Sequence, residues 1–272
     1  MNRHLFFPLL LGLCGALPAA AQRTVEGLVK AEQSFAAHSV KHGTRAAFLQ
    51  YMDSNSVLFE KGEAVNGLKT WTLRENRPGI LNWHPQYVEL AASKDFGFST
   101  GPWTFQNGAN DTVSGRGQFI TVWTADPSGN WKFRVDIGVG GAPAVAGKEE
   151  IRFREVPQAP AGQLEDVLQA EQVFIESLNR RGFKAYSDVL SEISYLHRNG
   201  APVAATPEAR QAMILATPST LEFEITGSGM ARSGDLAYVY GSVRYGGKKE
   251  AFLHIWRKEN DRWMMAVEVL RY

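Results

Sequence analysis

The sequence predicts an α+β fold arranged as two consecutive domains of the same type. The first observation is an internal repeat, in which SKDFGFSTGPWTF at residues 93–105 resembles SGDLAYVYGSVRY at residues 233–245. The second is the order of patterns in each copy, where apolar residues at helical spacing precede alternating segments typical of antiparallel strands. The third is a segment rich in proline and glycine between the copies, which is typical of a linker.

Residues 1–21 have the pattern of a secretory signal peptide and are set aside. Arg3 and His4 precede a short apolar run, and the segment ends in three alanines before Gln22. The run is shorter than the roughly 20 apolar residues that span a bilayer. We therefore expect a protein that is exported to the periplasm or secreted, with no membrane anchor after cleavage.

Composition narrows the classes of function. The single cysteine, Cys14, lies inside the expected signal peptide, so the exported protein would be stabilised by its core and not by disulfides. The formal net charge of +1 and the lack of a basic stripe argue against nucleic acid as a partner. The sequence also lacks the G-x-S-x-G, H-E-x-x-H, phosphate-loop and dinucleotide-binding motifs, and we predict no cofactor.

Further matches place the domain boundaries. AEQSF at 31–35 returns as AEQVF at 170–174, FITVW at 119–123 returns as FLHIW at 252–256, and NWKFRVDIG at 130–138 matches RWMMAVEVL at 262–270. The matches occur in the same order in both copies. They predict a first domain over residues 22–138, a linker over 139–161 and a second domain over 162–272.

Each copy predicts the same series of elements. The first helix ends before Gly43 in one copy and before Gly182 in the other, as expected of glycine just past a helix. A short second helix, a brief strand and a third helix follow, and Thr206 with Pro207 marks the start of the third helix in the second copy. Four strands complete each copy, and residues 151–156 could add an edge strand to either domain.

This order of elements resembles the nuclear-transport-factor-2-like, SnoaL-like superfamily. The residues that carry the resemblance are the S-x-D motif at the start of a strand and the final W-x-x-x-V-(D/E) strand, and it covers residues 25–138 and 163–272. It implies two cone-shaped domains, each with three helices packed in a strongly curved, mainly antiparallel sheet that often encloses an apolar pocket. Members of the superfamily include isomerases, cyclases, dehydratases and proteins that merely associate, so the resemblance implies a fold and not a function.

The S-x-D motifs themselves are expected to be structural. Asp95 and Asp235 follow tight turns, where aspartate commonly accepts a hydrogen bond from its own backbone.

Enzymes of this superfamily place ionisable groups in an apolar cavity, where burial shifts their pKa. The candidate catalytic residues are Asp136 with His84 in the first copy and Glu268 with His254 in the second. Strict alternation places Asp136 on the face of the strand that Phe133 does not share, which is typical of a solvated charge. Glu268 has apolar neighbours on its own face, which predicts a raised pKa or a cationic partner for its carboxyl. For His84, a satisfied histidine of the core or rim is the favoured interpretation over a catalytic base.

Five of the seven tryptophans lie in the first copy, which indicates either a large core or an aromatic pocket for a planar apolar ligand. The candidate ligand-binding residues are Trp71, Trp83, Trp103, Trp123 and Tyr51. His38 and His42 have the i, i+4 spacing of metal ligands, but a third ligand is lacking nearby in sequence and histidine is also favoured at a helix end, so we predict no metal.

The sequence therefore favours binding of a small apolar or aromatic molecule in the first domain. Two alternatives stay open: a proton-transfer enzyme of the isomerase, cyclase or dehydratase type, and a non-enzymatic structural or interaction module with filled cones. The final strand of the second copy is apolar on both faces, so we expect the two domains to pack as an intrachain pseudo-dimer through the outer faces of their sheets.

Overall fold

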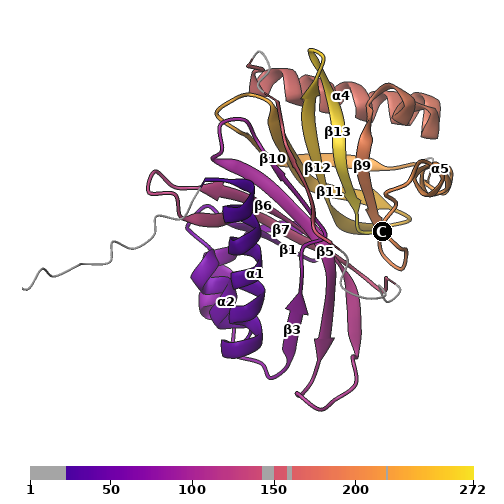
Figure 1. The fold of residues 1–272 in the computed structure, drawn as a ribbon. Helices are drawn as coiled ribbons and strands as arrows, with labels where there is room; N and C mark the ends of the chain where they lie inside the picture. The colour runs from indigo at the N-terminus through magenta and orange to yellow at the C-terminus, as the bar shows by residue number, and fades with distance from the viewer. Residues whose placement is uncertain (1–22, 143–149, 158–160, 219) are drawn as a thin grey trace, which may run out of the picture.

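The computed structural model describes residues 23–142, 150–157, 161–218 and 220–272. The expected signal peptide with Cys14 and parts of the expected linker lie outside these residues. We call residues 23–157 the N-terminal half and residues 161–272 the C-terminal half, and each half contributes one β-sheet (Figure 1). Within the described ranges, no helix is long and apolar enough to cross a membrane.

The N-terminal half begins with two helices and continues with strands, and a third helix lies between the second and third strands along the chain. Its elements are α1 (Val25–His42), α2 (Thr44–Tyr51), β1 (Val57–Glu60), β2 (Glu63–Asn66), α3 (Gly67–Leu73), β3 (Ile80–Trp83), β4 (Tyr87–Leu90), β5 (Phe96–Gln106), β6 (Gly115–Ala125), β7 (Trp131–Gly140) and β8 (Arg152–Glu155). Gly43 ends α1 with a φ of 89°, a conformation that favours glycine, as its place in the sequence predicts.

The C-terminal half also begins with helical elements and ends in a series of strands. Its elements are α4 (Leu164–Arg181), the 3₁₀ helix η1 (Gly182–Asp188), β9 (Leu190–Arg198), α5 (Pro207–Leu215), β10 (Glu222–Met230), β11 (Leu236–Tyr245), β12 (Lys248–Glu259) and β13 (Arg262–Leu270). Thr206 caps α5 by accepting a hydrogen bond from the backbone N–H of Ala209, and Pro207 is the first helical residue, as predicted.

The two sheets share a strand order. The N-terminal sheet runs β2-β1-β7-β6-β5-β4-β8 with β3 also paired to β5, and the C-terminal sheet runs β10-β11-β12-β13-β9. In both, the brief strand after the helices pairs in parallel with the last strand of the meander, β1 with β7 and β9 with β13. The mixed helix and sheet content confirms the α+β class.

Two differences from the predicted elements have simple causes. Five strands and not four lie between α3 and β8, because Pro85 lacks a backbone N–H and separates β3 from β4. Residues 152–155 form β8, which pairs in parallel with β4, so the optional edge strand belongs to the N-terminal sheet.

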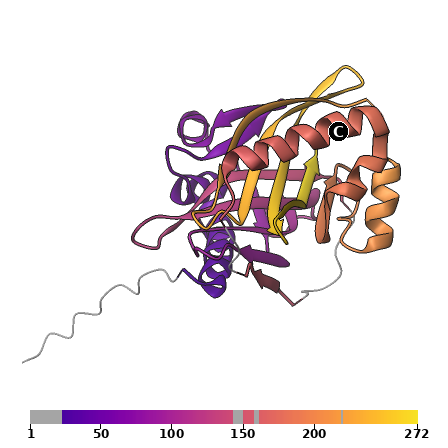
Figure 2. The same cartoon turned by 90° about the horizontal axis from the view of Figure 1, so that it is seen from above.

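The chain packs as four layers, with α1 and α2 outermost on one side and α4 outermost on the other (Figures 1 and 2). One core lies between α1, α2 and the N-terminal sheet, and a second lies between α4 and the C-terminal sheet. A third core lies between the two sheets and includes Phe98 and Val135 from one half and Tyr238 and Val267 from the other. Strand β13 is buried on both faces from Met265 to Leu270, which its apolar pattern predicts.

The S-x-D turns join the two halves, which differs from the expected bond to their own backbones. The backbone N–H of Ala92 donates to Oδ2 of Asp235 at 2.8 Å, and Nε of Arg232 donates to Oδ2 of Asp95 at 2.6 Å. Each aspartate therefore accepts a hydrogen bond from the other half. The turns meet because the sheets pack face to face, a long-range contact that local sequence cannot show.

Candidate functional site

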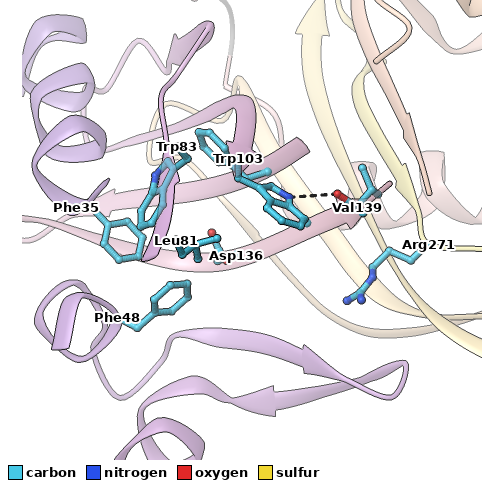
Figure 3. A pocket seen from close by; sticks show the side chains of 11 residues that line it. Phe35, Phe48, Leu81, Trp83, Trp103, Asp136, Val139 and Arg271 are labelled. Atoms are coloured by element: carbon cyan, nitrogen blue, oxygen red, sulfur yellow. Dashed lines mark hydrogen bonds between the residues drawn. The ribbon is translucent and has the colours of Figure 1, made fainter. Parts of the chain in front are cut away.

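A pocket of about 360 Å³ opens in the N-terminal half between the helices and the concave side of the sheet (Figure 3). Aromatic side chains form much of its wall, and a single carboxyl group faces it. The lining residues are Phe35, Phe48, Leu81, Trp83, Trp103, Phe119, Asp136, Gly138, Val139, Gly140 and Arg271.

A β-bulge places Asp136 in this pocket. Val122 pairs with Val135 and Trp123 pairs with Phe133, so Arg134 is an extra residue without a partner in the ladder. One extra residue reverses the alternation beyond it. Asp136 therefore lies on the helix side of the sheet together with Phe133, which corrects the expectation that alternation puts it on the opposite, solvated face.

The surroundings of Asp136 favour its neutral form. Thr121 Oγ1 donates to Oδ2 of Asp136 at 2.8 Å, and the part of the carboxyl that stays exposed faces the pocket. Burial raises the pKa of Asp136 to about 7, and the nearby Glu32 adds to the rise, whereas the bond from Thr121 opposes it. The group therefore changes protonation near neutral pH, where an acid–base catalyst works best.

Glu32 lies fully buried on α1 behind the pocket wall. Its carboxyl accepts hydrogen bonds from Nε1 of Trp83 at 2.5 Å, Oγ of Ser99 at 2.5 Å and Nε1 of Trp123 at 2.9 Å. Burial raises the pKa of Glu32 and outweighs these three donors. Glu32 thus fixes the orientation of two tryptophans and is not itself among the pocket-lining residues.

Glycine makes room for one wall of the pocket. Trp103 lies across β6 and β7, with its Nε1 donating to the carbonyl oxygen of Val139 at 3.2 Å. A Cβ atom at Gly117 would come within 2.7 Å of the Trp103 ring and within 1.9 Å of the Val139 oxygen. A side chain at this position would therefore displace Trp103.

Two of the five predicted ligand-binding residues, Trp83 and Trp103, line the pocket. The other three lie in the surrounding core. Trp123 is fully buried against Glu32, Trp71 stacks on Phe48 with ring centres 4.1 Å apart, and Tyr51 packs on Phe35 with ring centres 5.0 Å apart.

The expected pairing of His84 with Asp136 is not what the structure shows. His84 follows β3 at the Pro85 interruption and is not among the residues that line the pocket. Its backbone N–H donates to the carbonyl oxygen of Pro102 on β5 at 3.4 Å. The residue that influences Asp136 from the helix side is Glu32 instead.

In the C-terminal half, the corresponding positions form a closed ionic network. His254 and Glu268 lie opposite each other on β12 and β13, as the sequence predicts, with Nε2 and Oε2 3.5 Å apart. Nδ1 of His254 lies 2.8 Å from Glu171, and Glu268 accepts from Tyr186 and forms an ion pair with Arg198. His254, Glu171 and Glu268 are fully buried, so solvent does not reach them.

The charges of this network are fixed near neutral pH. Burial lowers the pKa of His254, but Glu171 and Glu268 outweigh burial and raise it to about 9. Burial likewise raises the pKa of Glu268, but Arg198 and His254 outweigh it and hold the pKa at about 2. A protonated His254 beside an ionised Glu268 suits a structural role, because neither group is a free base at pH 7.

The two histidines of α1 lie side by side. The rings of His38 and His42 lie 4.5 Å apart. Among the residues that the structure describes, no three histidine, cysteine or acidic side chains are grouped to hold a metal ion.

Sequence reasoning missed Glu32 and Arg271. The signal for Glu32 was a carboxylate in the middle of an apolar helical face, repeated as Glu171 in the second AEQ motif. Arg271 belongs to the C-terminal half but lines the pocket of the N-terminal half, and no local pattern points to that contact.

Comparisons with known proteins give similarity only at the level of solved structures. No family model matches the sequence, and no curated protein matches it. An NTF-2-like protein of unknown function from Shewanella oneidensis MR-1 is 20% identical with a TM-score of 0.33, and the match covers 40% of this chain and 98% of that protein. A ketosteroid isomerase-like protein from Erwinia carotovora atroseptica SCRI1043 is 20% identical with a TM-score of 0.34, covering 40% and 94%. An NTF2-like protein of unknown function from Methylobacillus flagellatus KT is 13% identical with a TM-score of 0.34, covering 42% and 98%.

Proposed function

We propose that this is an exported protein in which two tandem NTF2-like cone domains pack as an intrachain pseudo-dimer. The shared strand order supports the repeat. So do the bulges, because the extra residue is Arg134 in β7 and Ala266 at the matching place in β13. The core between the two sheets supports the pseudo-dimer.

The N-terminal domain binds a small apolar or aromatic molecule in this proposal. The observation that carries it is the pocket of about 360 Å³ with aromatic walls and one ionisable group, Asp136. Small-molecule sites are typically apolar clefts of roughly 300 to 1,000 Å³ with few polar groups. The C-terminal domain has a supporting role, since the His254–Glu268 network occupies the place that Thr121 and Asp136 hold at the pocket.

Filling the pocket tests the proposal. We expect 2-acetonaphthone, a neutral aromatic ketone, to bind the wild-type protein at one site by isothermal titration calorimetry. Leu81→Trp puts a larger side chain in the pocket wall. We expect it to weaken binding at least about tenfold, because the ligand is displaced and loses apolar contact area. The matched control is Leu215→Trp, at an exposed position on α5 in the other half, and it should bind as the wild type does.

Equal affinity in the Leu81→Trp and Leu215→Trp variants would place binding elsewhere. Absence of binding by the wild type at millimolar ketone would contradict the proposed site.

A second candidate function is proton transfer, and the position of Asp136 favours it. The carboxyl lines the apolar pocket and has a pKa near 7, so it can accept a proton from a bound carbon acid or return one. This chemistry needs neither metal nor nucleophilic serine. Thr121 would orient the carboxyl through its bond to Oδ2.

A further inference from the structure

The pocket of the N-terminal half receives one cation from the other half of the chain. Arg271 follows β13 at the end of the C-terminal sheet and lines the pocket. Figure 3 shows Arg271 at one end of the pocket and Phe35 and Phe48 at the opposite end, with Asp136 between them.

The backbone of Arg271 is held in place at the pocket rim. Asn199 donates from Nδ2 to the carbonyl oxygen of Arg271 at 2.8 Å, and its Oδ1 accepts from the backbone N–H of Gly140 at 3.1 Å. Gly140 itself lines the pocket, and its carbonyl oxygen accepts from the N–H of Gly200 at 2.7 Å. Asn199 thus links Gly140 at the pocket rim to the backbone of Arg271 from the C-terminal half.

Among the residues that the structure describes, no carboxylate forms an ion pair with the guanidinium group of Arg271. Nε of Arg271 is buried without a hydrogen-bond partner, and none of the ion pairs among the described residues includes Arg271. By contrast, the buried arginines Arg198 and Arg257 each pair with a glutamate. A buried polar atom without a partner carries a desolvation penalty, which an anionic ligand at the pocket would relieve.

We propose that the pocket takes an aromatic or alicyclic carboxylate, whose ring lies among the aromatic side chains and whose anionic group is bound by Arg271. The inference rests on the proposed binding function and specifies its ligand class. Guanidinium groups suit carboxylates because their planar donors match the two carboxylate oxygens. The two halves would then have to stay joined for the site to be complete.

A pair of probes of similar shape tests the charge requirement. The probes are 2-naphthoate and 2-acetonaphthone, which share a ring system and differ in that a carboxylate replaces a neutral methyl ketone. Titrations at pH 6 keep Asp136 largely neutral, so that its charge does not oppose the anion. We expect the wild type to bind 2-naphthoate at least about tenfold more tightly than the ketone, the scale of a charge-assisted hydrogen bond.

Arg271→Met should remove this preference, because it keeps an apolar stem of similar length but lacks the positive charge. Arg271→Lys should retain part of the preference, since the charge remains without the planar donors. Arg180→Met, at an exposed position on α4, is the matched control and should keep it fully.

Provided that the ketone still binds, two results would overturn the inference. One is an unchanged ratio of the two affinities in Arg271→Met, and the other is a wild type that shows no preference for 2-naphthoate. Failure of both probes to bind the wild type would instead overturn the proposed function, and this inference with it.

Discussion

Replacing Arg257 with methionine is expected to lower the free energy of unfolding by about 3 to 5 kcal/mol, the usual result of removing one partner of a buried ion pair. Arg257 on β12 forms two bonds of 2.5 Å to Glu89 on β4, and both side chains are fully buried between the sheets. The variant would leave the Glu89 carboxyl in the core without its cationic partner and with Tyr87 as its remaining donor, at 2.8 Å. Urea unfolding followed by circular dichroism measures the change.

The matched control removes both charges. The double variant Arg257→Met with Glu89→Leu should recover most of the lost free energy, because apolar side chains can replace a buried pair with little penalty. A loss below about 1 kcal/mol in the single variant, or no recovery in the double variant, would show that this pair does not hold the sheets together.

Asp136→Asn is expected to abolish proton transfer in the pocket. The probe is 5-nitrobenzisoxazole, an apolar aromatic molecule in which a base removes the ring C–H proton while the N–O bond breaks, giving a coloured cyanophenolate. The wild-type rate should rise as pH increases through about 7, because only the ionised carboxylate accepts the proton. The asparagine variant should be at least about 100-fold slower at pH 8.

At pH values above 7, the same substitution should raise the free energy of unfolding relative to that of the wild type. The pKa of Asp136 rises from an ordinary 3.8 to about 7 in the folded protein, so the folded state binds more protons than the unfolded state in this range. The stability of the wild type therefore falls as pH rises from about 4 to about 7. Asparagine does not titrate and can still accept a hydrogen bond from Thr121. The free energy of unfolding of the variant minus that of the wild type should therefore be about 2 kcal/mol larger at pH 8 than at pH 4, allowing for water in the pocket.

Asp111→Asn, in the exposed loop between β5 and β6, is the control and should match the wild type in both measurements. A wild-type rate equal to that of Asp136→Asn at every pH would rule out the carboxyl as the base. A stability difference that does not depend on pH would contradict its raised pKa.

The helices were predictable because their signals are local. Gly43 and Gly182 end α1 and α4, and Thr206 with Pro207 starts α5, since each of these residues acts on the backbone beside it. The spacing of the matched segments, 14 positions from Phe105 to Phe119 but 7 from Tyr245 to Phe252, also indicates a longer hairpin loop in the first copy. The structure has eight residues between β5 and β6 (107–114) and two between β11 and β12 (246–247).

The site was less predictable because it depends on contacts far apart in the chain. The bulge at Arg134 cannot be seen in an alternating pattern, yet it decides which face Asp136 occupies. Glu32 has its role only because Trp83 and Trp123 fold back onto α1, across sequence separations of 51 and 91 residues. Arg271 comes from the other half altogether.

The pH 7 ¹H–¹⁵N spectrum of the seven tryptophan indoles, recorded while 2-acetonaphthone is added, tests most directly whether the N-terminal half holds the ligand. Trp83 and Trp103 line the pocket and should show the largest shifts. Trp256 is fully buried against Glu171 in the C-terminal half and should not move. Shifts of Trp256 with Trp83 and Trp103 unchanged, or no shift at all at saturating ketone, would contradict the account.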